Sequence, residues 1–149
     1  DTTTPDTRLA DDPMKFNPAS VRSLLQYMLG AIHPGHRGSV LHARLRYFDP
    51  VRRRAGIPSD VASLVEKMDD NSVTVTLVNT NPLASRELIL QAGGYREHQF
   101  RTLRAGNKEK VINGPYVRIH LKPGCGEQLT VTMDRYRRIP TLAHPWTSP

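Results

Sequence analysis

The chain has 149 residues and a net charge of +7, and both quantities limit what kind of protein it is. The length suits one domain, or one small domain with an extension, and it allows a substantial buried core. Twelve prolines, ten glycines and a hydrophobic fraction of 38% indicate many turns and a segment outside the core. No run approaches the roughly 20 apolar residues of a membrane-spanning helix. A single cysteine, Cys125, excludes an internal disulfide and a cysteine-based zinc site.

The positive charge comes mainly from arginine. Five of the 21 basic residues are Lys, which leaves 16 Arg, a bias that a GC-rich genome produces without any ligand. The basic residues are scattered except in two groups, which are Arg52, Arg53 and Arg54, and Arg135, Arg137 and Arg138. Because clustered basic residues bind polyanions, these groups define an alternative function, a basic nucleic-acid or polyanion-binding protein. Scattered charge on a solvated surface is the favoured interpretation, and it makes nucleic acid an unfavoured partner.

Residues 1–16 are polar and rich in Thr and Asp, which predicts a disordered or draped arm. The first residue is Asp1, and no apolar stretch follows it as in a signal peptide. This start suggests a processed chain or a piece of a longer protein. We favour a larger exported protein, in an extracellular or periplasmic location.

A helix is predicted over residues 18–29. Asn17 is a suitable N-cap, and Pro18 suits the first helical position because its missing N–H would be unpaired there. One apolar stripe follows at helical spacing, and we expect it to dock on the sheet core: Val21, Leu24, Leu25, Met28 and Leu29. Gly30 then ends the helix.

Residues 17–71 as a whole are predicted to form a helical extension with one strand. The strand is expected over Val40–Phe48, where apolar and polar residues alternate, and Asp49–Pro50 closes it. A second, short helix is expected after Ser59, an N-cap residue type. Its apolar face would consist of Val61, Leu64, Val65 and Met68.

From residue 72 the period of the sequence changes to two. Six short strands separated by turns predict an antiparallel β-sandwich over residues 72–138, so the fold class is mainly β with an N-terminal helical extension. Ala105-Gly106-Asn107 indicates a hairpin turn. The residues predicted to be buried are Val75, Leu77, Val117, Ile119, Leu121, Leu129 and Val131, with Thr74, Arg118, His120 and Thr130 on the opposite face. The tail, residues 139–149, is predicted to be extended and to pack across the sheet through Trp146.

Two segments carry a resemblance to a known domain. Residues 73–79 (VTVTLVN) and 117–124 (VRIHLKPG) resemble the all-β domain that closes many bacterial glycoside hydrolases. In those domains a strand ending in Asn opens the sandwich, and a strand and turn of the pattern Val-x-Leu-x-Pro-Gly lead into the final strand. Residues 41–50 and 61–66 are similar to the lead-in to this sandwich in large bacterial proteins. The resemblance implies a non-catalytic module that braces a catalytic domain.

Several candidate sites remain. Tyr95, Glu97 and His98 follow the Gly93-Gly94 bend, and together they are the predicted carbohydrate-binding residues. Glu97 and Asp134 are the acids best placed to act as a carboxylate pair in glycoside hydrolysis. The loop around His33 and His36 has metal-ligand spacing but lacks a third ligand and a helix to fix it.

The sequence has no nucleophile elbow and no phosphate-binding loop, so we predict no catalytic residue, no metal site and no cofactor. The function it favours is a non-catalytic β-sandwich module of a larger bacterial carbohydrate-active protein. Its partner would be the remainder of that protein or a neighbouring subunit, with carbohydrate as a possible ligand. The alternatives are the polyanion-binding protein and a small structural subunit of a larger assembly.

Overall fold

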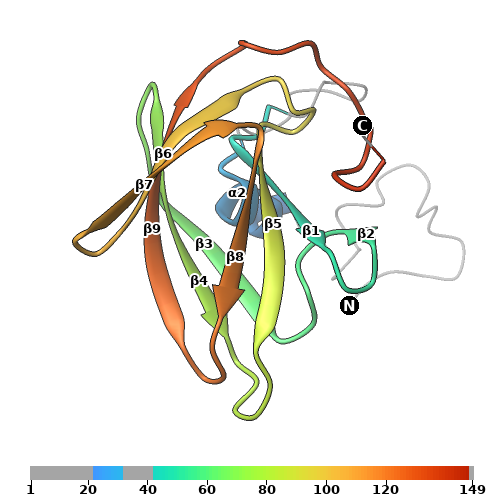
Figure 1. Ribbon diagram of the computed structural model, residues 1–149, viewed down its shortest axis with the longest axis vertical. Helices are drawn as coiled ribbons and strands as arrows, with labels where there is room; N and C mark the ends of the chain where they lie inside the picture. Colours follow the sequence, from blue (N-terminus) through green and yellow to red (C-terminus); the bar gives the residue numbers. More distant parts are fainter. Residues whose placement is uncertain (1–21, 32–41, 148–149) are drawn as a thin grey trace, which may run out of the picture.

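The computed structural model describes residues 22–31 and 42–147, which form a β-sandwich of two antiparallel sheets (Figure 1). The first sheet contains, in order, β2 (Arg54–Ala55), β1 (Leu45–Asp49), β5 (Arg86–Ala92) and β8 (Tyr116–Leu121). The second contains β3 (Val61–Met68), β4 (Ser72–Asn79), β9 (Gly126–Asp134), β6 (Gln99–Ala105) and β7 (Lys108–Gly114). The predicted fold class, a mainly β sandwich, is confirmed.

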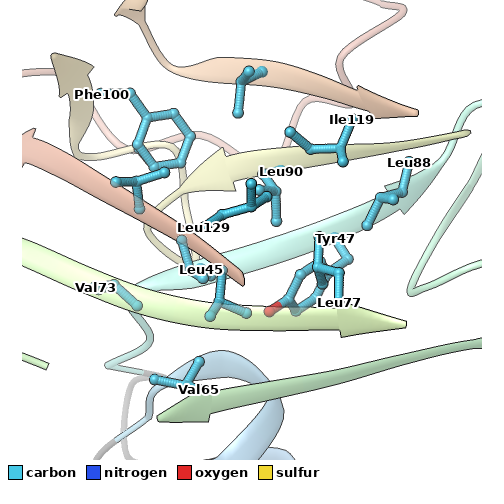
Figure 2. Close-up of a cluster of buried hydrophobic side chains, with 14 of the residues drawn as sticks. Leu45, Tyr47, Val65, Val73, Leu77, Leu88, Leu90, Phe100, Ile119 and Leu129 are labelled. Atoms are coloured by element: carbon cyan, nitrogen blue, oxygen red, sulfur yellow. The ribbon is translucent and has the colours of Figure 1, made fainter. Parts of the chain in front are cut away.

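The core lies between the two sheets and follows from the two-residue period of the strands. Every second side chain of a strand faces the core, and apolar side chains of both sheets meet there (Figure 2). All seven side chains that were predicted to be inward are buried, at 8% exposure or less. Arg118 and His120 are exposed on the opposite face, so the predicted register is confirmed. Burying one Leu or Val side chain contributes about 1.5 to 3 kcal/mol, so this alternation supplies most of the force that holds the sheets together.

The six strands predicted after residue 72 are present as β4 to β9. The predicted hairpin joins β6 to β7, with Ala105 opposite Lys108. Gly106 in its turn has a φ of 55°, in the left-handed region that glycine adopts most readily. The two sheets also contain strands that precede residue 72, namely β1 and β3.

The helix predicted after Ser59 is wrong, because residues 61–68 form β3. This strand pairs along its length with β4, and Val61 and Val65 are buried against the core. The apolar residues have helical spacing, but pairing with β4 overrides it and leaves Leu64 and Met68 exposed, at 46% and 45%. Asp69 begins the turn of the β3–β4 hairpin, and its N–H donates to the carbonyl of Ser72 (2.9 Å).

The strand predicted over residues 40–48 is observed as β1, which begins five residues later. Ala43 forms an isolated antiparallel bridge with Ala31, just after the helix. This bridge ties the end of the helix to the start of the first sheet. Residues 1–21, including the predicted arm and the Asn17 cap, lie outside the described residues, as do His33 and His36.

The predicted N-terminal helix is present as α2 (Arg22–Leu29), but its docking face differs from the prediction. Leu24 and Leu25 are 56% and 44% exposed, whereas Leu29 packs against the core. The carbonyl of Met28 accepts hydrogen bonds from the Tyr47 hydroxyl (2.6 Å) on β1 and from the Ser63 hydroxyl (3.3 Å) on β3.

These contacts link the C-terminal end of α2 to β1 of the first sheet and to β3, the edge strand of the second. Burial raises the pKa of the Tyr47 hydroxyl, so this group remains a hydrogen-bond donor. Within the described ranges, no helix is long and apolar enough to span a membrane.

The C-terminal tail passes over one end of the sandwich and descends along the first sheet (Figure 1). The N–H of Thr141 donates to the carbonyl of Tyr95 (2.7 Å), which fixes the tail to the β5–β6 loop. Trp146 then lies edge-on against Phe48 of β1, and His144 stacks on Trp146 (ring centroids 5.8 Å and 5.2 Å apart, respectively). The predicted packing of the tail through Trp146 is confirmed.

Candidate functional site: a polar cleft at one end of the sandwich

A cleft of about 530 Å³ lies at the end of the sandwich where five chain segments meet. These segments are the end of α2, the start of β1, the β3–β4 turn, the β5–β6 loop and the residues after β9. Its volume is in the range of small-ligand sites, although its lining is more polar than is usual for them. The polar side chains of the lining are His42, Arg44, Asp69, Asp70, Glu97, His98, Arg135 and Tyr136.

The β5–β6 loop positions Glu97 at the wall of this cleft. Gly93 has a φ of 88°, and a Cβ atom at this position would overlap the Glu97 carboxylate. The backbone N–H of Tyr95 donates to Oε2 of Glu97 (2.7 Å). Glycine therefore serves two purposes here, since it adopts the left-handed conformation and leaves room for a buried carboxylate.

His98 and Tyr136 form the next part of the wall. The N–H of Tyr136 donates to Nδ1 of His98 (3.0 Å), so Nδ1 is unprotonated and the ring hydrogen of neutral His98 is on Nε2. Tyr136 has a φ of 54°, a costly conformation for a bulky residue. Its ring meets the His98 ring edge-on (4.8 Å between centroids) and remains 63% exposed. The strained backbone thus holds an exposed aromatic ring beside the cleft.

The surroundings of His98 favour its neutral form. Burial lowers the pKa of the His98 ring, the Glu97 carboxylate acts against this shift, and the guanidinium groups of Arg135 and Arg44 add to it. Oε1 of Glu97 lies 3.7 Å from Nε2 of His98. The neutral ring and the buried carboxylate are therefore held beside two cationic side chains.

The structure brings two of the three predicted carbohydrate-binding residues to this cleft. Glu97 and His98 line it. Tyr95 does not line it, but its backbone supports the site because its N–H binds Glu97 and its carbonyl binds the tail. Sequence reasoning did not select Arg44, which directly precedes β1, or Tyr136, which lies two residues after β9, at the same end of the sandwich as the Gly93–Gly94 bend.

The two arginine groups of the polyanion alternative lie at opposite ends of the sandwich. Arg135 follows the end of β9 and lines the cleft, whereas Arg52 follows the end of β1, beside the start of β3. Arg52 and Arg54 also contact neighbouring groups, through the Ser59 hydroxyl (2.9 Å) and the Asp49 carboxylate (3.6 Å), respectively. Arg53, Arg137 and Arg138 are exposed. The described structure therefore does not gather these arginines into one surface.

The predicted carboxylate pair is divided between different contacts. Glu97 is buried in the cleft wall, whereas Asp134 forms an ion pair with Arg101 of β6. The hydrogen bond and the charge of Arg101 hold the pKa of Asp134 below its ordinary value. His33 and His36, which have metal-ligand spacing, lie outside the described residues, and the described residues contain no cluster of metal-ligating side chains.

The chain matches no known protein-family model, and comparisons with curated proteins and with solved structures found no match.

Proposed function

We propose that the chain is a non-catalytic β-sandwich module of a larger carbohydrate-active protein, and that it binds saccharide in the cleft at the end of the sandwich. The observation that carries this proposal is the combination in one cleft of charged hydrogen-bonding groups with the exposed ring of Tyr136.

The chemistry of the lining supports a saccharide ligand. A sugar hydroxyl both donates and accepts hydrogen bonds, and the cleft offers an acceptor on Asp70 and donors on Arg44. The C–H face of a sugar ring packs on exposed aromatic rings, and Tyr136 presents one. The groove beside Arg52, at the other end of the sandwich, is lined by no aromatic side chain among residues 22–31 and 42–147.

The state of the acidic residues supports a non-catalytic role. Acid–base catalysis requires titratable groups whose environments separate their pKa values. Several acids here instead form ion pairs: Asp60 with Arg86, Asp69 with Lys67, Glu87 with Arg118 and Asp134 with Arg101. Hydrogen bonds hold the pKa of Asp69 below its ordinary value, which keeps this cleft residue ionised.

Attachment to a larger protein is supported by α2. This helix is fixed to the sandwich through its C-terminal end, and it leaves Leu24, Leu25 and Tyr27 more than 40% exposed. Exposed apolar side chains on one element are typical of an interaction surface. The same observation favours the alternative of a small structural subunit in an assembly.

The proposal is tested by measuring saccharide binding and turnover on the same purified chain. Calorimetric titration with a panel of neutral and acidic oligosaccharides should give saturable binding that Tyr136→Ala weakens. Tyr27→Ala, which removes an exposed tyrosine from α2, is the matched control and should leave affinity unchanged. Hydrolysis of aryl glycosides or polysaccharides that disappears in Glu97→Gln or Asp134→Asn would contradict the non-catalytic role, and the absence of any binding would contradict the saccharide ligand.

A further inference from the structure

Two arginine side chains, Arg44 and Arg135, line the cleft and have no acidic partner among the described residues. The ion pairs of the described residues use other arginines, namely Arg54, Arg86, Arg101 and Arg118. Arg44 donates to the backbone carbonyl of Asp69 at a long 3.4 Å, and Arg135 donates to the Tyr136 hydroxyl (3.3 Å). Within the described part of the chain, no carboxylate lies in ion-pair distance of either guanidinium group.

The two guanidinium groups are near enough to affect each other. Burial and then the charge of Arg135 lower the pKa of Arg44, while Tyr136 and Asp70 act in the opposite direction. Both side chains remain charged, because a guanidinium group does not lose its proton in proteins. Two neighbouring cations repel each other, and an anion placed between them would relieve this repulsion.

The acids of the cleft are mostly engaged elsewhere. Asp69 binds Lys67 (3.0 Å) and the Ser72 hydroxyl (3.1 Å). Glu97 accepts from the N–H of Tyr95 and lies beside His98. Asp70 is the remaining acid of the lining, and it is exposed. The cleft thus has two arginines available for an anion and one exposed carboxylate available for hydroxyl groups.

We propose that the cleft is selective for acidic saccharides, whose carboxylate or sulfate group binds between Arg44 and Arg135. This inference rests on the proposed function and names its ligand class. A guanidinium group presents parallel N–H donors that match the paired oxygens of such an anion. The sugar ring would then lie toward Tyr136, with its hydroxyl groups within reach of Asp70.

Calorimetric titration of the full chain tests the inference with three matched ligands: oligogalactose, oligogalacturonate and sulfated oligogalactose. We expect an acidic form to bind at least about tenfold more tightly than the neutral form, because hydrogen bonds to charged groups are the strong ones. Arg44→Gln and Arg135→Gln should each remove this preference. Arg104→Gln, on an exposed position of β6, is the control and should retain it. Bound anion should also raise the pKa of His98, which is measurable from its ring-proton NMR signals.

The outcomes separate the inference from the proposed function. Equal affinity for neutral and acidic ligands would overturn the inference and leave saccharide binding intact, whereas no binding of any saccharide would overturn both. The two acidic ligands identify which anion is preferred. Polyglutamate serves as an anion without sugar, and equally tight binding of polyglutamate would overturn the inference because charge alone would then explain the affinity. If a variant is destabilised, two measurements on the wild type still test the inference. These are its preference for acidic over neutral oligosaccharide and the shift in the pKa of His98 on binding.

Discussion

The two ends of the sandwich differ in how their polar groups are used. At the end opposite the cleft, Asn79 is fully buried, and its side-chain amide donates to the carbonyls of Ala84 (2.8 Å) and Lys122 (3.1 Å). Its carbonyl oxygen accepts from the N–H of Asn81 (3.0 Å). At the cleft end, Arg44 and Arg135 have no such set of partners among the described residues. One end therefore uses its polar groups to close the fold, and the other keeps polar groups available to a ligand.

The turn that follows Asn79 also has its polar groups paired within the fold. Beside Asn79, Asn81 accepts hydrogen bonds from the N–H groups of Leu83 and Ala84, and its amide donates to Asp60. Asp60 also binds Arg86 (2.6 Å), and these hydrogen bonds lower its pKa. This exposed network is a means of ordering the turn rather than a source of large stabilisation, because exposed ion pairs contribute little.

The largest expected loss of stability comes from removing the Asn79 side chain at the end opposite the cleft, which we call the closed end. Asn79→Ala would leave buried carbonyl groups and the N–H of Asn81 without their partner, at a cost of about 3 kcal/mol in the free energy of unfolding. Urea denaturation measures this loss. Thr80→Ala, at the neighbouring exposed position, is the control and should cost less than about 1 kcal/mol. Similar values for the two variants would show that the closed end does not depend on Asn79.

A smaller effect is expected from the glycine that shapes the cleft wall. Gly93→Ala should destabilise the chain by about 2 kcal/mol, since the left-handed conformation is strained and the new Cβ overlaps Glu97. Gly106→Ala is the matched control, because Gly106 also has a positive φ but has no atom within 4 Å of the added Cβ. Adding Glu97→Ala to Gly93→Ala should recover part of the lost stability. Equal losses in the two alanine variants would show that Glu97 does not fill the space beside Gly93.

The third effect is a dependence of stability on pH. The folded-state pKa of His98 is lowered, so the unfolded state binds its proton more readily, and folding stability is lost as the pH falls below about 6.5 toward the folded pKa. Protonation would also break the hydrogen bond from Tyr136, because Nδ1 would become a donor. His98→Asn keeps an acceptor and removes the titration.

Thermal unfolding between pH 7 and pH 5 measures this difference. We expect the wild type to lose more stability than His98→Asn over that range. Asp60, Asp69 and Asp134 have lowered pKa values, so their contributions are lost at more acidic pH, below about 4. A His98→Asn variant that loses stability as steeply as the wild type would exclude His98 as the titrating group.

The strands could be predicted from the sequence where alternation and turn residues agreed. Val117, Ile119 and Leu121 alternate with polar residues and end at a Pro-Gly turn, and their register was correct. Residues 61–68 have an apolar spacing that also fits a helix, and only the pairing with β4 resolves it. Leu24 and Leu25 have helical periodicity, but periodicity does not say which part of a helix meets the core.

The cleft could be predicted only in part for a related reason. Glu97 and His98 follow a double glycine, which is a local signal of a special backbone. Arg44 and Arg135 are 91 positions apart in the numbering (135 minus 44), and they line one cleft only because β1 begins where β9 ends. Which residues distant in the sequence come together depends on the order of the strands in the sheets, and the sequence does not reveal this order directly.

The central claim is that ligand binds at the cleft end of the sandwich, and an NMR titration tests it most directly. Backbone amide and arginine side-chain signals of the isotope-labelled chain would be followed as acidic and neutral oligosaccharides are added. The account predicts the largest shifts at Arg44, His98, Arg135 and Tyr136, with the signals around Asn79 unchanged. Shifts confined to the opposite end, around Arg52 to Arg54, would contradict it.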